Sequence, residues 1–462
     1  MDRLTPLSDA FLEAENGDST ASLAIGSFAV FAGPAPPFED FVRGIEERLP
    51  LVPRYRQKLR GTPFGLAAPA WVDDPDFDLR WHIRNTALPS PGGQAEIGRL
   101  LSRVMTRRMD RSRPLWEYWF CEGLPGGQWG LLSKLHHCLA DGVSGTDLYR
   151  LVLDSSPDPH SRPHIVDEWQ PAPPQSTLSF TAQGLWDSAT APAAGVRAFG
   201  AALGAPRRLA QLTLQTVTGL LAITGALRPV DGSSLTGRLG GSRRYAWTTV
   251  SLSDIRTVRR RFGSSVNDVA LAAAAGGFRR LLQSRGEEPT AHAVRSLVPV
   301  STRPPGTESI TDNRVSLMLP YLPVVLADPC ARLDAVRERV RVLRSAGEPE
   351  AGASVTTAAE FGPFPPVAMG IRLGLRLPQH QIATVTTNVP GPRETLYSFG
   401  RELLEILPYV PIADRVRIGV AIFSYRDALT FGITADYDAV PDVEVLADGI
   451  ATSMAELVEA AG

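Results

Sequence analysis

The chain has 462 residues, of which 44% are hydrophobic and 21% charged, and its formal net charge is -2. This length exceeds the size at which one hydrophobic core usually stops growing, so we expect two domains of about 200 residues each, with connectors. The balanced charge excludes the basic excess typical of nucleic-acid-binding proteins, and no nucleic-acid partner is expected.

Cysteine content and the amino-terminal segment indicate the compartment. Cys121, Cys138 and Cys330 are an odd number, widely spaced and without the clustering of a metal site, which favours a reducing, intracellular environment. The segment MDRLTPLSDAFLEAENGD is acidic where a signal peptide has a basic start and an apolar run. Since no later stretch reaches about 18 uninterrupted apolar residues, we expect a cytoplasmic protein without a membrane span.

Residues 1–155 alternate helical and strand-like patterns and form the first predicted domain. Its clearest element is a β-hairpin, because two aromatic-rich runs flank GLPGGQ, a turn signal of glycine and proline. The second run, about Trp129–Leu135, leads directly into His136 and His137. We therefore expect both histidines at the end of a strand.

Residues 156–244 are predicted to form a connector followed by amphipathic helices. Six prolines fall among polar residues between Ser155 and Gln175, which is typical of an extended linker. Residues 178–229 then contain one acidic residue, Asp187, and four arginines among many apolar side chains. This pattern is compatible with contact with an anionic membrane surface, but it more often indicates an ordinary packing face.

Residues 245–462 are predicted to form a second α/β domain of similar size. A strand-like run, YAWTTVSL, precedes a helical run, NDVALAAAAGGFRRLLQSRG, and a further strand-like run, VRSLVPVS. Further strands are expected over RIGVAIFSYRDALTFGITADY, and the last helix over DVEVLADGIATSMAELVEAA.

The segment HHCLADG contains the residues best suited to chemistry. Adjacent histidines on a strand point to opposite faces, so at most one of His136 and His137 can face a given cavity. An imidazole with a pKa near neutrality can take a proton from an alcohol and return it to a leaving group, as acyl transfer requires. Asp141, which precedes Gly142, could contact the imidazole or brace the turn through an arginine, and the residues alone favour neither.

Two other interpretations of the same segment are weaker. A metal site would need His136 and His137 to converge with Asp141, which strand alternation opposes, and we predict no metal. His136 and Asp141 also match the HxxxxD pattern of glycerol-phosphate acyltransferases, but those enzymes differ in every other motif.

With HHCLADG identified, the chain resembles the bacterial wax ester synthase/diacylglycerol acyltransferase family, in particular its actinobacterial triacylglycerol synthases. The matching segments are spread over most of the chain: RLTPLSDAFLEAE, RPLWEYW, NDVALA, LVPVSTR, DNRVSLMLP, TNVPGP and SYRDALTFGITADYD. HHxxxDG alone is shared with chloramphenicol acetyltransferases, plant acyltransferases and peptide-synthetase condensation domains, and specifies only the reaction type. The resemblance implies an α/β fold of two chloramphenicol-acetyltransferase-like domains that form a pseudo-dimer around a central channel.

The resemblance also implies roles for individual residues. The second histidine of the motif is the base in this family, which assigns that role to His137 and leaves His136 a supporting one. Asp141 is expected to point away and form a structural ion pair, with Arg303 as the preferred partner and Arg295 as the next.

Three further residues are candidates for substrate binding or for stabilising an oxyanion. Asn267 and Asn388 lie in motifs that the family places near the channel, and Gly142 closes HHCLADG. Each asparagine also has a structural interpretation of equal weight. Asn267 precedes a helical run and could be its N-cap, and Asn388 lies in a turn-forming segment.

The function implied by the resemblance is direct acyl transfer from a long-chain acyl-CoA to diacylglycerol, with fatty alcohols as second acceptors. Acyl-CoA and the lipid alcohol are the expected partners; no cofactor and no obligate protein partner are expected. Peripheral contact with the inner membrane face or lipid droplets would bring the enzyme to its acceptor. The alternatives are a condensation-type acyltransferase that uses carrier-bound acyl groups, and an inactive lipid-binding homologue, against which the intact motif counts.

Overall fold

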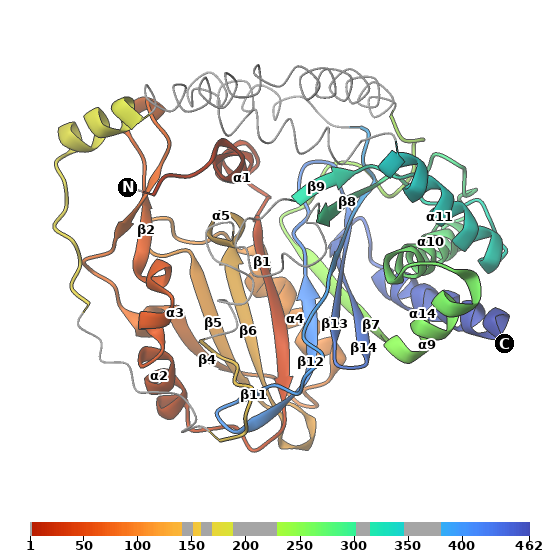
Figure 1. Cartoon of the computed structure of the whole chain (residues 1–462), viewed down its shortest axis with the longest axis horizontal. Helices are drawn as coiled ribbons and strands as arrows, with labels where there is room; N and C mark the ends of the chain where they lie inside the picture. The colour runs from red at the N-terminus through yellow and green to blue at the C-terminus, as the bar shows by residue number, and fades with distance from the viewer. Residues whose placement is uncertain (1, 141–150, 159–168, 188–228, 302–314, 346–379) are drawn as a thin grey trace, which may run out of the picture.

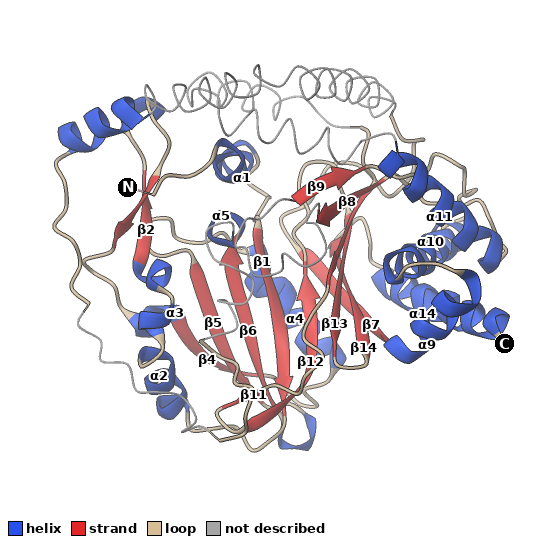
Figure 2. Ribbon diagram, in the orientation of Figure 1, coloured by secondary structure: helices blue, strands red, loops and turns tan. Residues whose placement is uncertain are grey.

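The computed structural model describes residues 2–140, 151–158, 169–187, 229–301, 315–345 and 380–462. Within these ranges the strands form two six-stranded sheets, which stand beside each other, and a small two-stranded sheet (Figures 1 and 2). Helices α9, α10, α11 and α14 cover the face of the second sheet that points away from the first (Figure 1). The predicted α/β class is confirmed. None of the described helices is long and apolar enough to cross a membrane.

The first sheet has the order β11-β12-β1-β6-β5-β4. Its strands are β1 (Ala24–Phe31), β4 (Ile83–Ala87), β5 (Trp116–Glu122), β6 (Trp129–His136), β11 (Tyr397–Ser398) and β12 (Arg401–Tyr409). Its helices are α1 (Pro6–Gly17), α2 (Phe38–Glu46), α3 (Leu79–His82), α4 (Gln94–Thr106) and α5 (His137–Ala140). The small sheet pairs β2 (Gln57–Arg60) with β3 (Ala70–Asp73), and short 3-10 turns lie at Leu49–Leu51, Pro53–Arg56, Pro63–Gly65 and Pro125–Gly127.

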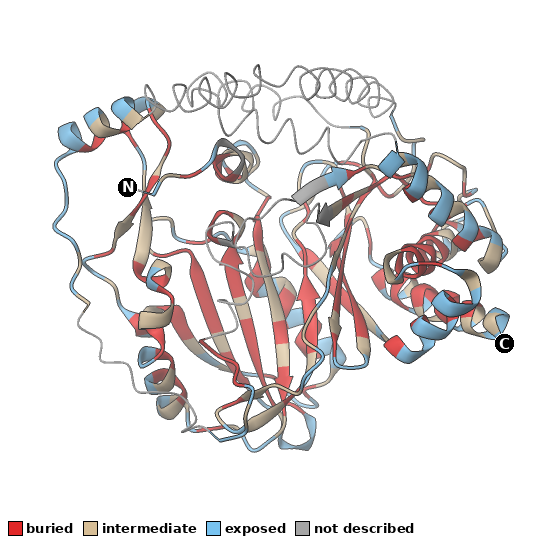
Figure 3. Ribbon diagram, viewed as in Figure 1, coloured by how far each residue is buried: buried red, intermediate tan, exposed pale blue. Residues whose placement is uncertain are grey.

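The predicted hairpin is confirmed as β5 and β6. The two strands are antiparallel, with Trp116 opposite Leu135. The turn between them contains three glycines with positive φ, Gly123, Gly126 and Gly127. Aromatic side chains anchor the hairpin in the core, because Trp129 is fully buried and stacks on Phe31 with ring centroids 4.4 Å apart. Figure 3 shows that β5 and β6 are buried along most of their length.

The second sheet has the order β7-β14-β13-β10-β8-β9. Its strands are β7 (Arg243–Ser251), β8 (Ser296–Ser301), β9 (Val315–Met318), β10 (Thr384–Val389), β13 (Ile418–Tyr425) and β14 (Ala428–Asp436). Its helices are α9 (Leu252–Phe262), α10 (Val266–Ser284), α11 (Pro329–Ser345) and α14 (Val443–Ala461). The alanine-rich α10 is buried and packs tightly on α14, since a Cβ at Gly277 would lie 2.7 Å from Ile450.

The carboxyl-terminal half supplies strands to the first sheet. We expected residues 245–462 to form the second domain, yet β12 pairs with β1 and places Gly26 opposite Tyr409. Hydrogen bonds join β12 to β7 of the second sheet, where the Tyr245 hydroxyl donates to the Pro408 carbonyl at 2.8 Å. Strand β12 therefore belongs to one sheet and contacts the other.

Candidate active site

The two histidines of HHCLADG lie where β6 ends and α5 begins, beneath α1 (Figure 1). Their backbone N–H groups donate in opposite directions: that of His136 to Leu115 at 3.0 Å, and that of His137 to Leu23 at 3.2 Å. Leu115 precedes β5 and Leu23 precedes β1, the two neighbours of β6. The side chains accordingly have different surroundings, as strand alternation predicts: His136 is 1% exposed, and His137 is only partly buried.

His136 is held inside the protein by local contacts. Its Nδ1 accepts the backbone N–H of Cys138 at 3.3 Å, and its Nε2 lies 3.5 Å from a carboxylate oxygen of Glu15. Nδ1 therefore faces Cys138, whose Sγ lies 2.9 Å away, and Nε2 faces the Glu15 carboxylate. This arrangement suits a residue that braces the motif and does not touch substrate.

Glu15 is a buried carboxylate that sequence reasoning missed. Its oxygens accept the Leu23 N–H at 2.6 Å and contact Arg111 at 2.9 Å. Burial by itself would raise the pKa of Glu15. The contacts with His136, Arg111 and the Leu23 N–H together outweigh this effect, and the pKa falls to about 2. Glu15 therefore remains charged throughout the neutral range.

Phe11 is the second missed residue, and it contacts His137 directly. The two rings are stacked with centroids 3.9 Å apart and planes inclined by 20°. Phe11 and Glu15 are four residues apart on α1 and thus share one face of that helix. The helical spacing was visible in PLSDAFLEAE, but nothing in it indicated which distant residues that face would contact.

Asn267 and Asn388 lie together, although 121 residues separate them. The Asn388 side-chain amide donates to Oδ1 of Asn267 at 3.1 Å. The alternative that made Asn267 an N-cap is wrong, because Ser265 caps α10 and its hydroxyl accepts the Asp268 N–H at 3.1 Å. Asn388 is likewise in strand β10 and not in the turn that follows it.

The side-chain nitrogen of Asn267 is buried and has no hydrogen-bond partner among the described residues. A buried amide N–H without an acceptor costs free energy, so such groups are uncommon unless something binds them. Asn267 thus has a donor available for a ligand, whereas its oxygen is already held by Asn388.

Several predicted site residues fall outside the described residues, namely Asp141, Gly142 and Arg303. The ion pair between Asp141 and Arg303 consequently stays a prediction. Arg295, the second candidate partner, is 4% exposed and stacks over the Tyr321 ring at 4.1 Å. Among the residues that the structure places, no three or more metal-ligating side chains come together.

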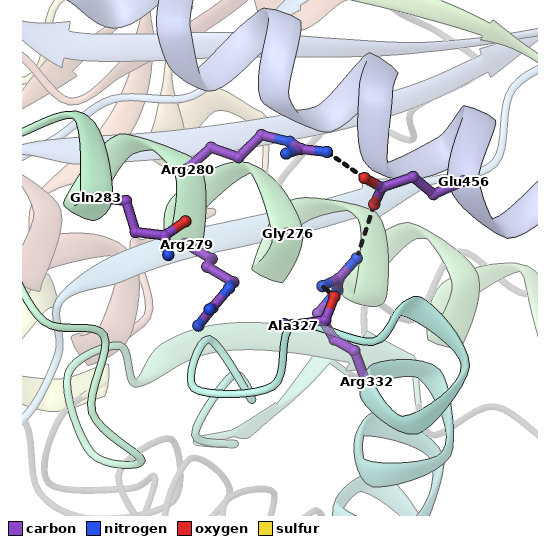
Figure 4. A pocket seen from close by; sticks show the side chains of 7 residues that line it. All are labelled: Gly276, Arg279, Arg280, Gln283, Ala327, Arg332 and Glu456. Atoms are coloured by element: carbon purple, nitrogen blue, oxygen red, sulfur yellow. Dashed lines mark hydrogen bonds and ion pairs between the residues drawn. The ribbon is translucent and has the colours of Figure 1, made fainter.

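A separate cavity of about 270 Å³ lies in the helical layer of the second sheet and includes no predicted site residue. It is lined by Gly276, Arg279, Arg280, Gln283, Ala327, Arg332 and Glu456 (Figure 4). Glu456 of α14 reaches Arg280 of α10 and Arg332 of α11, and Arg332 also donates to Ser453 at 2.9 Å. These contacts tie three helices together, which gives the arginines a structural role.

Comparison with known proteins accounts for both halves of the chain. Residues 4–270 match the wax ester synthase/diacylglycerol acyltransferase catalytic domain, and residues 311–458 match the C-terminal domain of the same family. A probable diacylglycerol O-acyltransferase, tgs1, of Mycobacterium tuberculosis is 42% identical over 459 residues, which cover 99% of this chain and 96% of the relative. A putative diacylglycerol O-acyltransferase of the same species is 34% identical and covers 99% and 91%.

Solved structures agree with this assignment. The wax ester synthase/diacylglycerol acyltransferase from Marinobacter aquaeolei VT8 is similar over all of both chains, with a TM-score of 0.68 and 26% identity. The first condensation domain of the CDA synthetase shares the fold alone, with a TM-score of 0.61 and 14% identity over 99% of this chain and 96% of that one. Both likenesses span the two sheets, which confirms the predicted two-domain architecture. The chain therefore belongs to the wax ester synthase/diacylglycerol acyltransferase family and is an acyltransferase.

Proposed function

We propose that this acyltransferase transfers a long acyl chain from acyl-CoA to diacylglycerol, with His137 as the general base. The observation that carries the proposal is the contrast within the histidine pair. His136 is buried against Glu15 and Cys138, whereas His137 is partly exposed at the start of a short helix. Only the second imidazole can meet a substrate without rearrangement of the core.

The chemistry needs one base and no covalent enzyme intermediate. The His137 imidazole removes the proton from the lipid hydroxyl as its oxygen attacks the thioester carbonyl carbon. The tetrahedral intermediate collapses and the carbon–sulfur bond breaks. The CoA thiolate that leaves is protonated by the imidazolium. The side-chain nitrogen of Asn267 is our candidate for the oxyanion donor, a contribution of about 3 kcal/mol at such sites, with Gly142 as the alternative.

The acceptor is proposed from the relatives. The named mycobacterial proteins are diacylglycerol O-acyltransferases, and the Marinobacter protein is also a wax ester synthase. We therefore place diacylglycerol first and long-chain fatty alcohols second. Carrier-bound acyl donors are the alternative that the shared condensation-domain fold raises.

The decisive experiment mixes the purified protein with palmitoyl-CoA and either diacylglycerol or hexadecanol, and follows free thiol and the ester formed. Thiol release that depends on the acceptor is expected, and its absence with both acceptors would rule out acyl-CoA as the donor. His137→Ala should abolish release, and His136→Ala should retain measurable turnover. Turnover by His137→Ala would show that another group is the base.

We also propose peripheral contact with lipid, since the acceptor resides in a lipid phase. Exposed apolar side chains gather on two segments: the 3-10 turn that carries Phe64, 98% exposed, and the helical residues 177–187, drawn in yellow in Figure 1. That helix exposes Leu178 and Trp186 by 84% and 71%. Large apolar side chains exposed together on a soluble protein often mark a surface that binds a protein or a membrane.

The two segments are neighbours in the fold. Arg60, just before the turn, donates to the Gln175 carbonyl at 2.8 Å, and Ala67, just after it, lies against Gly184 of the helix. Arg60 also stacks over Phe180 at 4.6 Å, on the face of the helix opposite Leu178. The sequence that follows, residues 188–228, has four arginines and no acidic residue, a composition that favours an anionic lipid surface.

A further inference from the structure

Helix α1 brings one side chain against each histidine of the motif. Phe11 stacks on His137, and Glu15, one turn later, lies 3.5 Å from His136. The helix begins at a Thr5 cap, whose hydroxyl accepts the Ser8 N–H at 3.1 Å. A capped helix that contacts both histidines of the motif is well placed to control their geometry.

We propose that helix α1 positions the catalytic base. Phe11 fixes the plane of the His137 ring, and Glu15 fixes the position of the His137 backbone. The inference rests on the proposed role of His137 as the base. Neither residue needs to touch substrate in this scheme, so both are positioning residues. Their effect is on the orientation of the imidazole, to which proton transfer is sensitive.

Phe11 acts through its flat contact with the imidazole. With ring centroids 3.9 Å apart and planes nearly parallel, the phenyl ring covers one face of the imidazole. Rotation of the His137 ring about its Cβ–Cγ bond would break this stack. A leucine at position 11 would keep an apolar contact but would leave the ring free to turn.

Glu15 acts on the His137 backbone through the backbone N–H and carbonyl of Leu23. Its carboxylate accepts the Leu23 N–H at 2.6 Å, and the carbonyl of Leu23 accepts the His137 N–H at 3.2 Å. Arg111 holds the other carboxylate oxygen at 2.9 Å and also donates to the Leu12 carbonyl at 3.0 Å, which ties α1 to the same anchor. The carboxylate group is 2% exposed, so it is out of reach of a substrate.

The test is steady-state kinetics with palmitoyl-CoA and diacylglycerol on Phe11→Leu, Phe11→Tyr and Glu15→Gln. We expect Phe11→Leu and Glu15→Gln to lower kcat about tenfold with both KM values unchanged, because the substrates still bind and the base is misaligned. Phe11→Tyr keeps the aromatic stack and should retain a kcat near that of the wild type. Thermal unfolding of each variant identifies any that fail to fold.

Phe31→Leu is the matched control, since Phe31 also stacks on a ring of β6, that of Trp129, at the end of the strand away from His137. It should lower stability and leave kcat unchanged at a temperature where the protein is folded. Wild-type kcat in Phe11→Leu and Glu15→Gln would overturn the inference, and so would an equal loss in Phe31→Leu. A wild-type enzyme without thiol release would instead count against the proposed function.

Discussion

His136 and His137 are adjacent in the sequence but differ in their surroundings, and the difference begins with their backbone bonds. One residue donates toward Leu115 and the next toward Leu23, on the two sides of β6. The first imidazole is then enclosed with a buried carboxylate, and the second emerges beside Phe11. In the proposed mechanism the partly exposed imidazole of His137 is the general base, and the buried imidazole of His136 supports the motif beside Glu15.

The charge of Glu15 should make stability depend on pH. Its pKa is about 2 in the folded protein against 4.5 for an ordinary glutamate, so the carboxylate stabilises the fold above pH 4.5, and this contribution is lost as the pH falls toward 2. The contribution amounts to about 3 kcal/mol. Urea unfolding of the wild type and Glu15→Gln between pH 7 and pH 3 should show a steeper decline in the wild type. Parallel curves would contradict the assignment.

Asn267 provides a prediction about the reaction. Its buried nitrogen has no partner among the described residues, and loss of one oxyanion donor typically lowers kcat by about 100-fold or more. Asn267→Ala should therefore lower kcat to that extent, with the protein still folded because Ser265 caps α10. If thiol release by Asn267→Ala matched the wild type, Asn267 would have no part in the oxyanion site.

At the scale of elements, close helix packing explains the small residues of α10. The alanines of α10 are buried, and Gly276 and Gly277 lie against α14, where Ser453 and Ile450 leave no room for a side chain. Ion pairs of Glu456 with Arg280 and Arg332, at the cavity, join α14 to α10 and α11 (Figure 4). The helical layer is therefore fastened by tight contact and by ion pairs.

Gly277→Val tests this packing. Its Cβ would lie 2.7 Å from Ile450 and 3.0 Å from the Leu446 carbonyl, so α10 and α14 would have to move apart. Overpacking of this kind typically costs about 1–3 kcal/mol, and the midpoint of thermal unfolding should fall. Gly17→Ala, at the end of α1 in open space, should leave the midpoint nearly unchanged. An unaltered midpoint in Gly277→Val would show that the helices are not in close contact.

At the scale of the whole molecule, β12 joins the two halves of the chain, and exposed apolar side chains lie near the small sheet. Strand β12 protects one edge of β1 and also contacts the second sheet through Pro408. Phe64 and Trp186 are exposed. The helix that carries Trp186, drawn in yellow in Figure 1, and the small sheet lie on the side of the first sheet away from β12. In the proposed contact with lipid, this is the face that would meet the lipid surface.

Lipid contact is tested by sedimentation with phosphatidylglycerol vesicles. Replacing Phe64 and Trp186 by serine should lower the bound fraction. The affinity for the vesicles should fall on the order of tenfold for each side chain that enters the lipid. Val342→Ser, at a 45% exposed position on α11, serves as the control and should bind as the wild type does. Equal binding by the double variant would exclude this surface, and loss of binding in high salt alone would indicate a purely electrostatic contact.

Features that depend on neighbours in the sequence could be predicted from it. The hairpin of β5 and β6 follows from a turn signal between two alternating runs, and the separation of His136 from His137 follows from the geometry of a strand. The family resemblance added the two-domain fold and the reaction class. Local pattern was enough for these, because turn formation and strand alternation act over a few residues.

Only the tertiary structure decided which distant residues meet. Phe11 and Glu15 contact histidines more than 120 residues away, Asn388 bonds to Asn267, and β12 leaves its own half to pair with β1. Periodicity indicates which face of an element is buried, but it does not identify the partner of that face. The partner depends on the path of the whole chain, and that is why the histidine motif could be found in the sequence and its support by α1 could not.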